Sequence, residues 1–232
     1  MQYKSLAVAL ALGMVFPVWN GCALARPAAL AQQYAAYEAA APSVIVDKPI
    51  VWNARRKELT EQYARIHYGW AFSTITPRAV VIHWTADNRA SSAWNWFNRE
   101  ASSKGTAQVA SHFLVDRDGT IYRLTPETRL NPHAIGYNWC AIGIENVGGK
   151  EGKEDLTEAQ LFANVWLIRH LHQNFPTIRT VFGHYQQDKA RSTGLYKEQV
   201  QGYHSVKHDP GPGFMQGLEE LLKGSGVVVL EP

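Results

Sequence analysis

Two short apolar runs, each followed by a histidine, constrain the fold of this chain more than any other feature. The runs cover residues 79–82 and 180–182, and the histidines that follow them are His83 and His184. Apolar runs of this length, rich in β-branched and aromatic residues, are typical of buried strands. We therefore expect both imidazoles at strand ends.

A carboxylate near the C-terminus extends this pattern to a possible metal site. Asp209 lies in segment 207–212, whose two prolines restrict the backbone beside the carboxylate. Two imidazoles and one carboxylate leave a fourth tetrahedral position for water, which is the arrangement of a catalytic zinc site and not of a structural one. The pattern predicts a zinc hydrolase. Because a single histidine is most often a core or surface residue, this prediction depends on all three residues together.

Five segments, in this order along the chain, extend the pattern further. They read VVIHWTA, SHFLVDRDGTIYRL, NPHAIGYNWCAIGIENVGG, VFGHYQQD and VKHDPGPGF. Together they resemble the zinc-dependent N-acetylmuramoyl-L-alanine amidases, a family that includes phage-type lysozyme amidases and peptidoglycan-recognition proteins. The resemblance covers roughly residues 78–222, and the Lys-x-Asp-Pro-Gly-Pro block is its most specific part.

The resemblance implies a role for each residue of the site. It makes His83, His184 and Asp209 the ligands of Zn²⁺, and it makes Glu145 and Lys207 the catalytic pair. Glu145 lies in an apolar run, where a carboxylate is costly to bury unless it is paired or poised for proton transfer. Lys207 is two residues from Asp209, so an extended backbone would bring its ammonium near the metal to stabilise an oxyanion. The alternatives are a structural ion pair for Glu145 and a solvated charge for Lys207.

Other histidines leave alternatives open. His208, next to Asp209, is chemically the better zinc ligand, so spacing alone allows a three-histidine site, whereas the family pattern favours Asp209. Some family members have cysteine at this position, but neither cysteine of this chain falls there. His133 matches a segment that lines the substrate groove in the family, and we expect it to bind substrate. We expect His112 to give structural support beside a hairpin-like turn.

The segment between His184 and Lys207 departs from the compact members of the family. Residues 185–206 form a polar stretch that is much longer than their connection, and it includes several tyrosines. Long loops without periodicity are uncommon unless they are functional or disordered. We therefore expect an additional flap over the cleft.

The N-terminus predicts export. An apolar run over residues 6–18, too short to span a bilayer, precedes small residues, which is typical of a secretory signal peptide over residues 1–25. Cleavage as late as Ala31 also fits the small-residue pattern. Cys22 offers a second interpretation, in which a lipid on this cysteine anchors a lipoprotein to a membrane. Soluble export to the periplasm or the medium is the simpler one.

Composition limits the partners of the chain. The 23 basic and 20 acidic residues give a formal net charge of +3, which argues against binding of nucleic acid. If Cys22 is removed or acylated, Cys140 is the remaining cysteine, so stability must come from a hydrophobic core and not from disulfides. The length allows one such core. We expect a monomer whose partner is peptidoglycan or muropeptides.

The coarse pattern predicts an α/β fold: a single domain with a central mixed β-sheet flanked by helices and a zinc site at strand ends. The expected parts are a partly helical N-terminal extension over residues 26–70, a zinc amidase domain over 71–223 and a C-terminal tail over 224–232. A capping box at Thr157 opens one helix, and residues 227–230 are either a late strand or an apolar tail. Helices are expected over 55–67, 89–103, 157–174 and 214–222.

These features predict an exported peptidoglycan hydrolase that uses zinc-activated water to cleave the amide between N-acetylmuramic acid and L-alanine. Two alternatives share the pattern. One is a non-lytic peptidoglycan-recognition module, although such relatives have typically lost a metal ligand and this chain has all three. The other is an exported amidase toxin directed against the cell walls of competitors.

Overall fold

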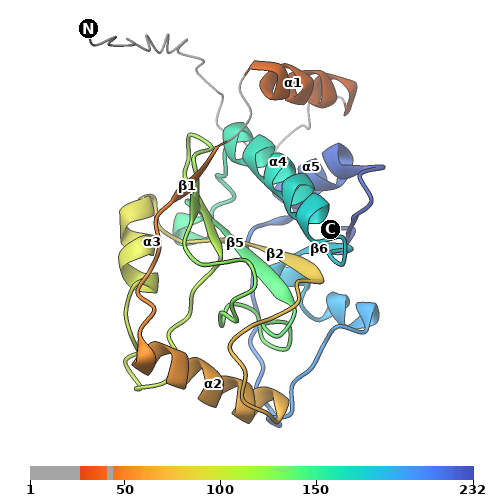
Figure 1. Cartoon of the computed structure of the whole chain (residues 1–232). Helices are drawn as coiled ribbons and strands as arrows, with labels where there is room; N and C mark the ends of the chain where they lie inside the picture. Colours follow the sequence, from red (N-terminus) through yellow and green to blue (C-terminus); the bar gives the residue numbers. More distant parts are fainter. Residues whose placement is uncertain (1–26, 41–43) are drawn as a thin grey trace, which may run out of the picture.

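The strands form one mixed sheet in a computed structural model that describes residues 27–40 and 44–232 (Figure 1). Within these residues the strand order is β1-β4-β3-β5-β2-β6-β7, and β3 and β4 are the one antiparallel pair of neighbours. The predicted α/β fold with a central mixed sheet is confirmed. The strands are β1 (Ile45–Asp47), β2 (Ala79–Trp84), β3 (Phe113–Val115), β4 (Ile121–Arg123), β5 (Ala141–Asn146), β6 (Thr180–Gly183) and β7 (Val228–Val229).

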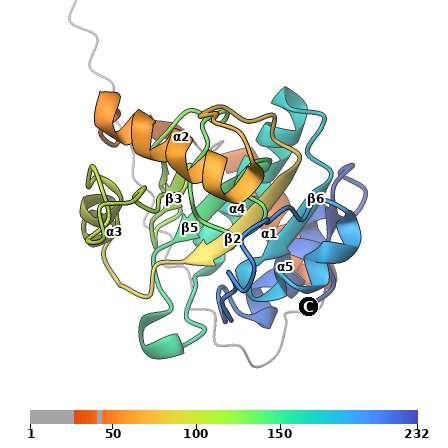
Figure 2. The same cartoon turned by 90° about the horizontal axis from the view of Figure 1, so that it is seen from below.

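Helices cover both faces of the sheet. Helices α1, α4 and α5 lie on one side of the sheet, and α2 and α3 lie on the other, as the two views show (Figures 1 and 2). Buried side chains of α1, α4 and α5 form one core cluster with strand residues, and those of α2 and α3 belong to separate clusters. None of the helices in the described residues is long and apolar enough to cross a membrane. The helices are α1 (Pro27–Ala40), α2 (Ala54–Tyr68), α3 (Ala90–Phe97), α4 (Glu158–Asn174) and α5 (Pro212–Leu222).

The central strands direct different residues to the two faces. Val80 and Ile82 of β2 are fully buried in the core formed with α1, α4 and α5. Because side chains alternate along a strand, His83 turns to the opposite face. The parallel register pairs His83 with Glu145 of β5. One face of the sheet therefore builds the core, and the other presents an imidazole and a carboxylate side by side.

The predicted capping box at the start of α4 is present and also anchors the helix to the sheet. Thr157 Oγ1 accepts a hydrogen bond from the Gln160 amide, and the Gln160 side chain accepts one from the Thr157 amide. Gln160 Nε2 in turn donates to the carbonyl oxygens of Val115 and Val147, at 3.1 and 2.9 Å. The helix start is thus fixed directly behind β3 and β5.

The N-terminal extension contributes to the core. Leu30 of α1 is 1% exposed, and the ring of Tyr34 packs edge-on against Phe162 of α4, with ring centroids 5.6 Å apart. Strand β1 joins the sheet through β4. The predicted signal peptide and Cys22 lie outside the described residues, which begin at Pro27.

Two local expectations change in the structure. The helix expected over residues 89–103 ends at Phe97, because the chain turns back and Ala101 forms an antiparallel bridge with Ala107. Residues 227–230 contain β7, which pairs with β6 at the edge of the sheet, so the strand alternative for the tail is the correct one.

Candidate functional site

Three elements bring the predicted metal ligands together. His83 is the penultimate residue of β2, and His184 directly follows β6. These strands are parallel neighbours, with Ile82 paired with Gly183, so the two histidines emerge at the same edge of the sheet. Asp209 comes from the loop before α5, and its carbonyl oxygen accepts a hydrogen bond from the amide of Tyr185 at 2.8 Å. The loop is thereby attached to the β6 end of the site.

The three side chains have a geometry that fits a metal ion. The Nδ1 atoms of His83 and His184 are 3.0 Å apart, and each lies 3.1 Å from Oδ2 of Asp209. A tetrahedron with zinc–ligand bonds of 2.0–2.1 Å has edges of about 3.3 Å, close to these separations. The side chains are 2%, 8% and 13% exposed, in the same order. The described residues contain one such group of possible metal ligands.

The protonation states also suit a cation. Burial raises the pKa of Asp209, but its contacts with His184 and His83 outweigh burial and hold that pKa well below its usual range. Burial and the neighbouring His83 lower the pKa of His184 to about 4. At neutral pH the site therefore offers a carboxylate and a neutral imidazole, the forms that bind a metal. The three residues fit Zn²⁺.

The structure distinguishes the two adjacent candidates for the third ligand. The side chain of His208 is exposed, whereas Asp209 turns inward to the two imidazoles. Neighbouring residues on an extended backbone face opposite directions, so only one of them can reach the cluster. The structure therefore does not form the alternative site in which His208 is the third ligand.

The predicted catalytic pair lines the same cleft as the ligands. The cleft has a volume of about 220 Å³, and Glu145, Lys207 and His133 are among its lining residues. Burial and the neighbouring Asp209 raise the pKa of Glu145 well above its usual range, and the Lys207 ammonium opposes this shift. A cation at the ligand cluster would oppose it as well. Oε2 of Glu145 is buried without a hydrogen-bond partner among the described residues.

His112 and His133 lie behind the ligands. Nδ1 of His112 accepts a hydrogen bond from the Gly143 amide. Nε2 of His112 donates a hydrogen bond to the Arg129 carbonyl oxygen, and these two atoms are 2.8 Å apart. The expected structural role of His112 is therefore confirmed. His133 contacts the ligand His83 and lines the cleft, a position compatible with the predicted contact to substrate.

An aromatic cavity adjoins the cleft, and the sequence did not indicate it. Its volume is about 400 Å³, and it shares Trp84, Phe97, Val109 and Glu145 with the metal cleft. Trp96 of α3 is 48% exposed and lines this cavity. Trp84 directly follows the predicted ligand His83 in the sequence. This position next to the predicted metal site was the one feature from which a substrate contact by Trp84 could have been predicted.

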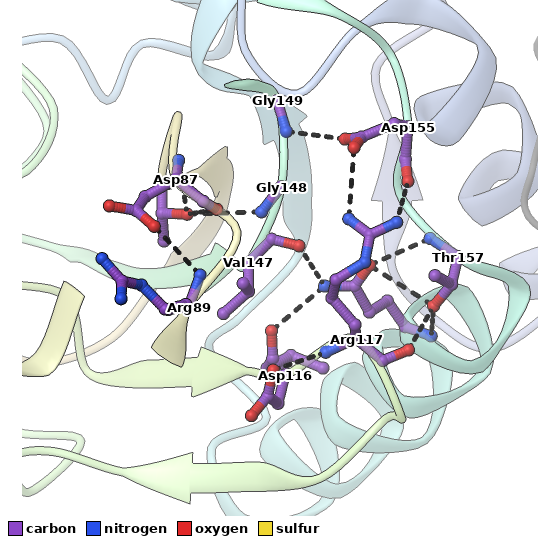
Figure 3. A network of polar contacts seen from close by, with 12 residues as sticks. Asp87, Arg89, Asp116, Arg117, Val147, Gly148, Gly149, Asp155 and Thr157 are labelled. Atoms are coloured by element: carbon purple, nitrogen blue, oxygen red, sulfur yellow. Dashed lines mark hydrogen bonds and ion pairs between the residues drawn. The ribbon is translucent and has the colours of Figure 1, made fainter. Parts of the chain in front are cut away.

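A polar network fixes the loop after β5 (Figure 3). This loop supports the wall of the aromatic cavity. Asp155 accepts a hydrogen bond from the Gly149 amide at 2.7 Å and pairs with Arg117 at 3.2 Å. Gly149 has φ +74°, and a Cβ there would lie 2.1 Å from the ring of Trp84. Asp87 forms an antiparallel bridge with Gly148 on the same side. The network thus holds the backbone against which Trp84 packs.

The segment 185–206 does not form the expected flap. None of its residues lines the metal cleft or the aromatic cavity. It packs instead against α2, where the Gln199 amide donates to the His67 carbonyl oxygen at 3.1 Å and His67 Nδ1 lies 2.9 Å from the Glu198 carboxylate. Trp139 Nε1 also donates to the Leu195 carbonyl oxygen. These contacts attach the segment to α2 and to Trp139.

Comparison with known proteins locates the similarity over this site. A family model described as N-acetylmuramoyl-L-alanine amidase matches residues 73–212, a range that contains all the predicted ligands and the catalytic pair. The endolysins of Escherichia phage T7 and Enterobacteria phage T3 are each 40% identical over 50 residues, which is 22% of this chain and 33% of each endolysin. The match thus spans one third of the length of these relatives.

Solved structures show the same fold. N-acetylmuramoyl-L-alanine amidase LysC from Clostridium intestinale URNW superposes with a TM-score of 0.53 at 21% identity, over 78% of this chain and 97% of that one. Drosophila peptidoglycan recognition protein SD superposes with a TM-score of 0.51 at 18% identity, over 82% and 98% of the two chains. Catalytic and recognition proteins therefore share this fold, and the site itself must distinguish between the two functions.

Proposed function

Because the chain belongs to the N-acetylmuramoyl-L-alanine amidase family, we propose that it is a zinc-dependent peptidoglycan hydrolase. The bond cleaved is the amide between the lactyl carbonyl of N-acetylmuramic acid and L-alanine of the stem peptide. One observation supports this proposal above the others: the buried cluster of two imidazoles and a carboxylate opens into a cleft that Glu145 and Lys207 also line.

His83, His184 and Asp209 would hold the zinc ion. When bound with a fourth position open, Zn²⁺ polarises a carbonyl and lowers the pKa of water toward neutrality. The single carboxylate leaves the ion with a net positive charge, which this chemistry requires. The buried position of the three side chains keeps their geometry fixed.

Glu145 would act as the general base. It lies beside His83 in the register of the sheet and lines the same cleft as the three proposed ligands. The water loses a proton to Glu145 as its oxygen bonds to the carbonyl carbon. Glu145 then returns the proton to the nitrogen of L-alanine as the carbon–nitrogen bond breaks. Burial raises the pKa of Glu145, which makes its carboxylate a stronger base for the first of these two transfers.

Lys207 would stabilise the negative charge that develops on the carbonyl oxygen. Its ammonium lines the cleft two residues from Asp209. A fixed cation in a partly closed cleft stabilises such a charge more than one in open water does. The aromatic cavity beside the cleft, with Trp84 and Trp96, gives sugar or peptide groups an apolar surface to pack against.

A peptidoglycan-recognition module without hydrolytic activity is the second candidate, since a recognition protein shares the fold. Release of free stem peptide from purified peptidoglycan, measured by mass spectrometry with zinc content, distinguishes the two. We expect wild type to release peptide, chelator to abolish release, and Glu145→Ala to lose release while zinc remains bound. Glu151→Ala, which removes an exposed carboxylate from the loop beyond β5, is the matched control. Zinc-loaded protein that binds the wall without releasing peptide would establish recognition instead.

Export is part of the proposed function, because the substrate lies outside the cytoplasm. The signal-peptide pattern over residues 1–25 supports delivery to the periplasm or the medium. Fractionation of cells that express the full chain tests this. Labelling with palmitate, in wild type and in Cys22→Ser, tests whether the exported protein is anchored by lipid.

A further inference from the structure

His133 lies between a zinc ligand and the backbone of β5, and both of its ring nitrogens are engaged. Nε2 is 3.1 Å from the carbonyl oxygen of Ala141, and Nδ1 is 3.1 Å from Nε2 of His83. A carbonyl oxygen can only accept, so Nε2 of His133 must carry a proton and donate it. In the neutral imidazole Nδ1 is then an acceptor, and the proton between the two rings belongs to Nε2 of His83.

This assignment decides which nitrogen of His83 is free to bind metal. A neutral imidazole has one N–H, so a proton on Nε2 of His83 leaves a lone pair on Nδ1. Nδ1 is the atom that lies 3.0 Å from His184 Nδ1 and 3.1 Å from Asp209 Oδ2. The opposite tautomer of His83 would direct a proton into the cluster and exclude a cation from it.

The His133 ring packs against a glycine, Gly143, which leaves space for it. Gly143 of β5 faces it, and a Cβ at this residue would lie 2.9 Å from both Cγ and Nδ1 of the His133 ring. Real Cβ atoms essentially never approach so closely. With any other residue at this position, the imidazole or the backbone of β5 would have to move. This requirement explains a glycine inside a central strand, where glycine otherwise weakens packing.

The backbone at His133 is held by Asn138. Oδ1 of Asn138 accepts hydrogen bonds from the amides of His133 and Ala134, at 2.8 and 2.7 Å, and Nδ2 donates to the hydroxyl of Tyr63 at 2.8 Å. Tyr63 belongs to α2, in the N-terminal extension. The position of the ring therefore depends on a side chain that is itself fixed from a second element.

We propose that His133 is a positioning residue that sets the tautomer of His83 and so creates the Nδ1 ligand atom for zinc. This inference rests on the proposed zinc site. It differs from the predicted role in substrate binding, because it requires an effect on metal affinity when no substrate is present. Residues that orient metal ligands in this way typically contribute 10- to 100-fold in affinity.

Zinc affinity, measured by competition with a chelating fluorophore in the absence of peptidoglycan, tests the proposal. We expect His133→Ala to weaken zinc binding about 10- to 100-fold. His133→Asn places an amide oxygen near the position of Nδ1 and keeps an acceptor for His83, so it should recover most of that loss. His204→Ala removes an exposed imidazole outside the cleft and is the matched control, with wild-type affinity.

A spectroscopic measurement on the wild type makes the test independent of how the variants fold. In zinc-loaded protein labelled with ¹⁵N-histidine, long-range ¹H–¹⁵N spectra report which nitrogen of each ring carries the proton. We expect a protonated Nε2 and a metal-bound Nδ1 at His83. The reverse assignment would overturn the proposal.

The outcomes separate this proposal from the proposed function. If wild type binds one zinc ion and His133→Ala binds it equally well, His133 does not position the ligand, and the zinc hydrolase proposal stands. If His133→Ala raises only the peptidoglycan concentration needed for half-maximal rate, His133 contacts substrate and the proposal is wrong. Wild type without a bound zinc ion would contradict both proposals.

Discussion

Acid should weaken the fold through His112, and this effect can be worked out from its surroundings. The imidazole is completely buried and donates to a backbone carbonyl oxygen while accepting from a backbone amide. Protonation would place a second N–H where an amide N–H already points. Burial lowers the pKa of His112 from 6.5 to about 4. In the unfolded chain the pKa returns to its ordinary value.

The sign follows from proton uptake. Between pH 6.5 and pH 4 the unfolded chain binds a proton at this residue and the folded protein does not, so the free energy of unfolding falls as pH falls. With pKa values of 6.5 and about 4, the contribution of His112 falls by about 2 kcal/mol between pH 7 and pH 5. Above pH 7 its contribution is constant.

The assay is urea unfolding of metal-free protein at pH 7 and pH 5, for wild type and for His112→Asn. Asparagine keeps an acceptor for the Gly143 amide but cannot titrate in this range. The variant should be less stable than wild type at pH 7, since the Arg129 carbonyl oxygen loses its donor, and it should lose about 2 kcal/mol less than wild type on acidification. His204→Asn, at an exposed histidine, controls for general effects. Equal losses in wild type and His112→Asn would refute this account of His112.

Three further predictions concern the ligands, the core and the cleft wall. Asp209→Ala should lose both zinc and peptide release, while His208→Ala should keep its zinc, as measured by metal analysis. Zinc loss in His208→Ala but not in Asp209→Ala would show that His208, and not Asp209, is the third ligand. Leu30→Ala should lower the free energy of unfolding by roughly 2–5 kcal/mol in urea titrations; an unchanged midpoint would mean that α1 does not contribute to the core. Gly149→Ala should reduce peptide release with zinc retained, because its Cβ displaces Trp84 from the cleft wall; unchanged rates would exclude that wall from substrate binding.

The parts of the fold that follow from local sequence were predictable. The apolar runs before His83 and His184 specify buried strands wherever they pair, and the capping box at Thr157 specifies a helix start from four consecutive residues. These signals need no knowledge of distant partners. The ligand positions followed from them, because both histidines come at or directly after the strand ends.

Features that depend on distant contacts were not predictable. Trp96 and Phe97 are neighbours on α3, and both line the aromatic cavity. Phe97 is 7% exposed and packs in the core, whereas Trp96 is 48% exposed, so apolar character alone cannot assign both to the core. The polar composition of segment 185–206 is equally consistent with an open flap and with packing against α2. The choice between His208 and Asp209 depends on which way the chain enters α5. In each case the deciding partner is far away in sequence.

The N-terminal extension contacts both the core and the surroundings of the proposed metal site. Helix α1 closes one side of the core, whereas α2 supports the opposite side of the sheet through Tyr63 and Asn138, which hold the backbone of His133. His133 contacts the ligand His83 directly. Segment 185–206, which was predicted to form a flap, also packs against α2. It therefore helps to hold α2, and with it Tyr63, in place. A boundary at residue 70 would therefore separate the proposed metal site from Tyr63, which holds the segment around His133 through Asn138.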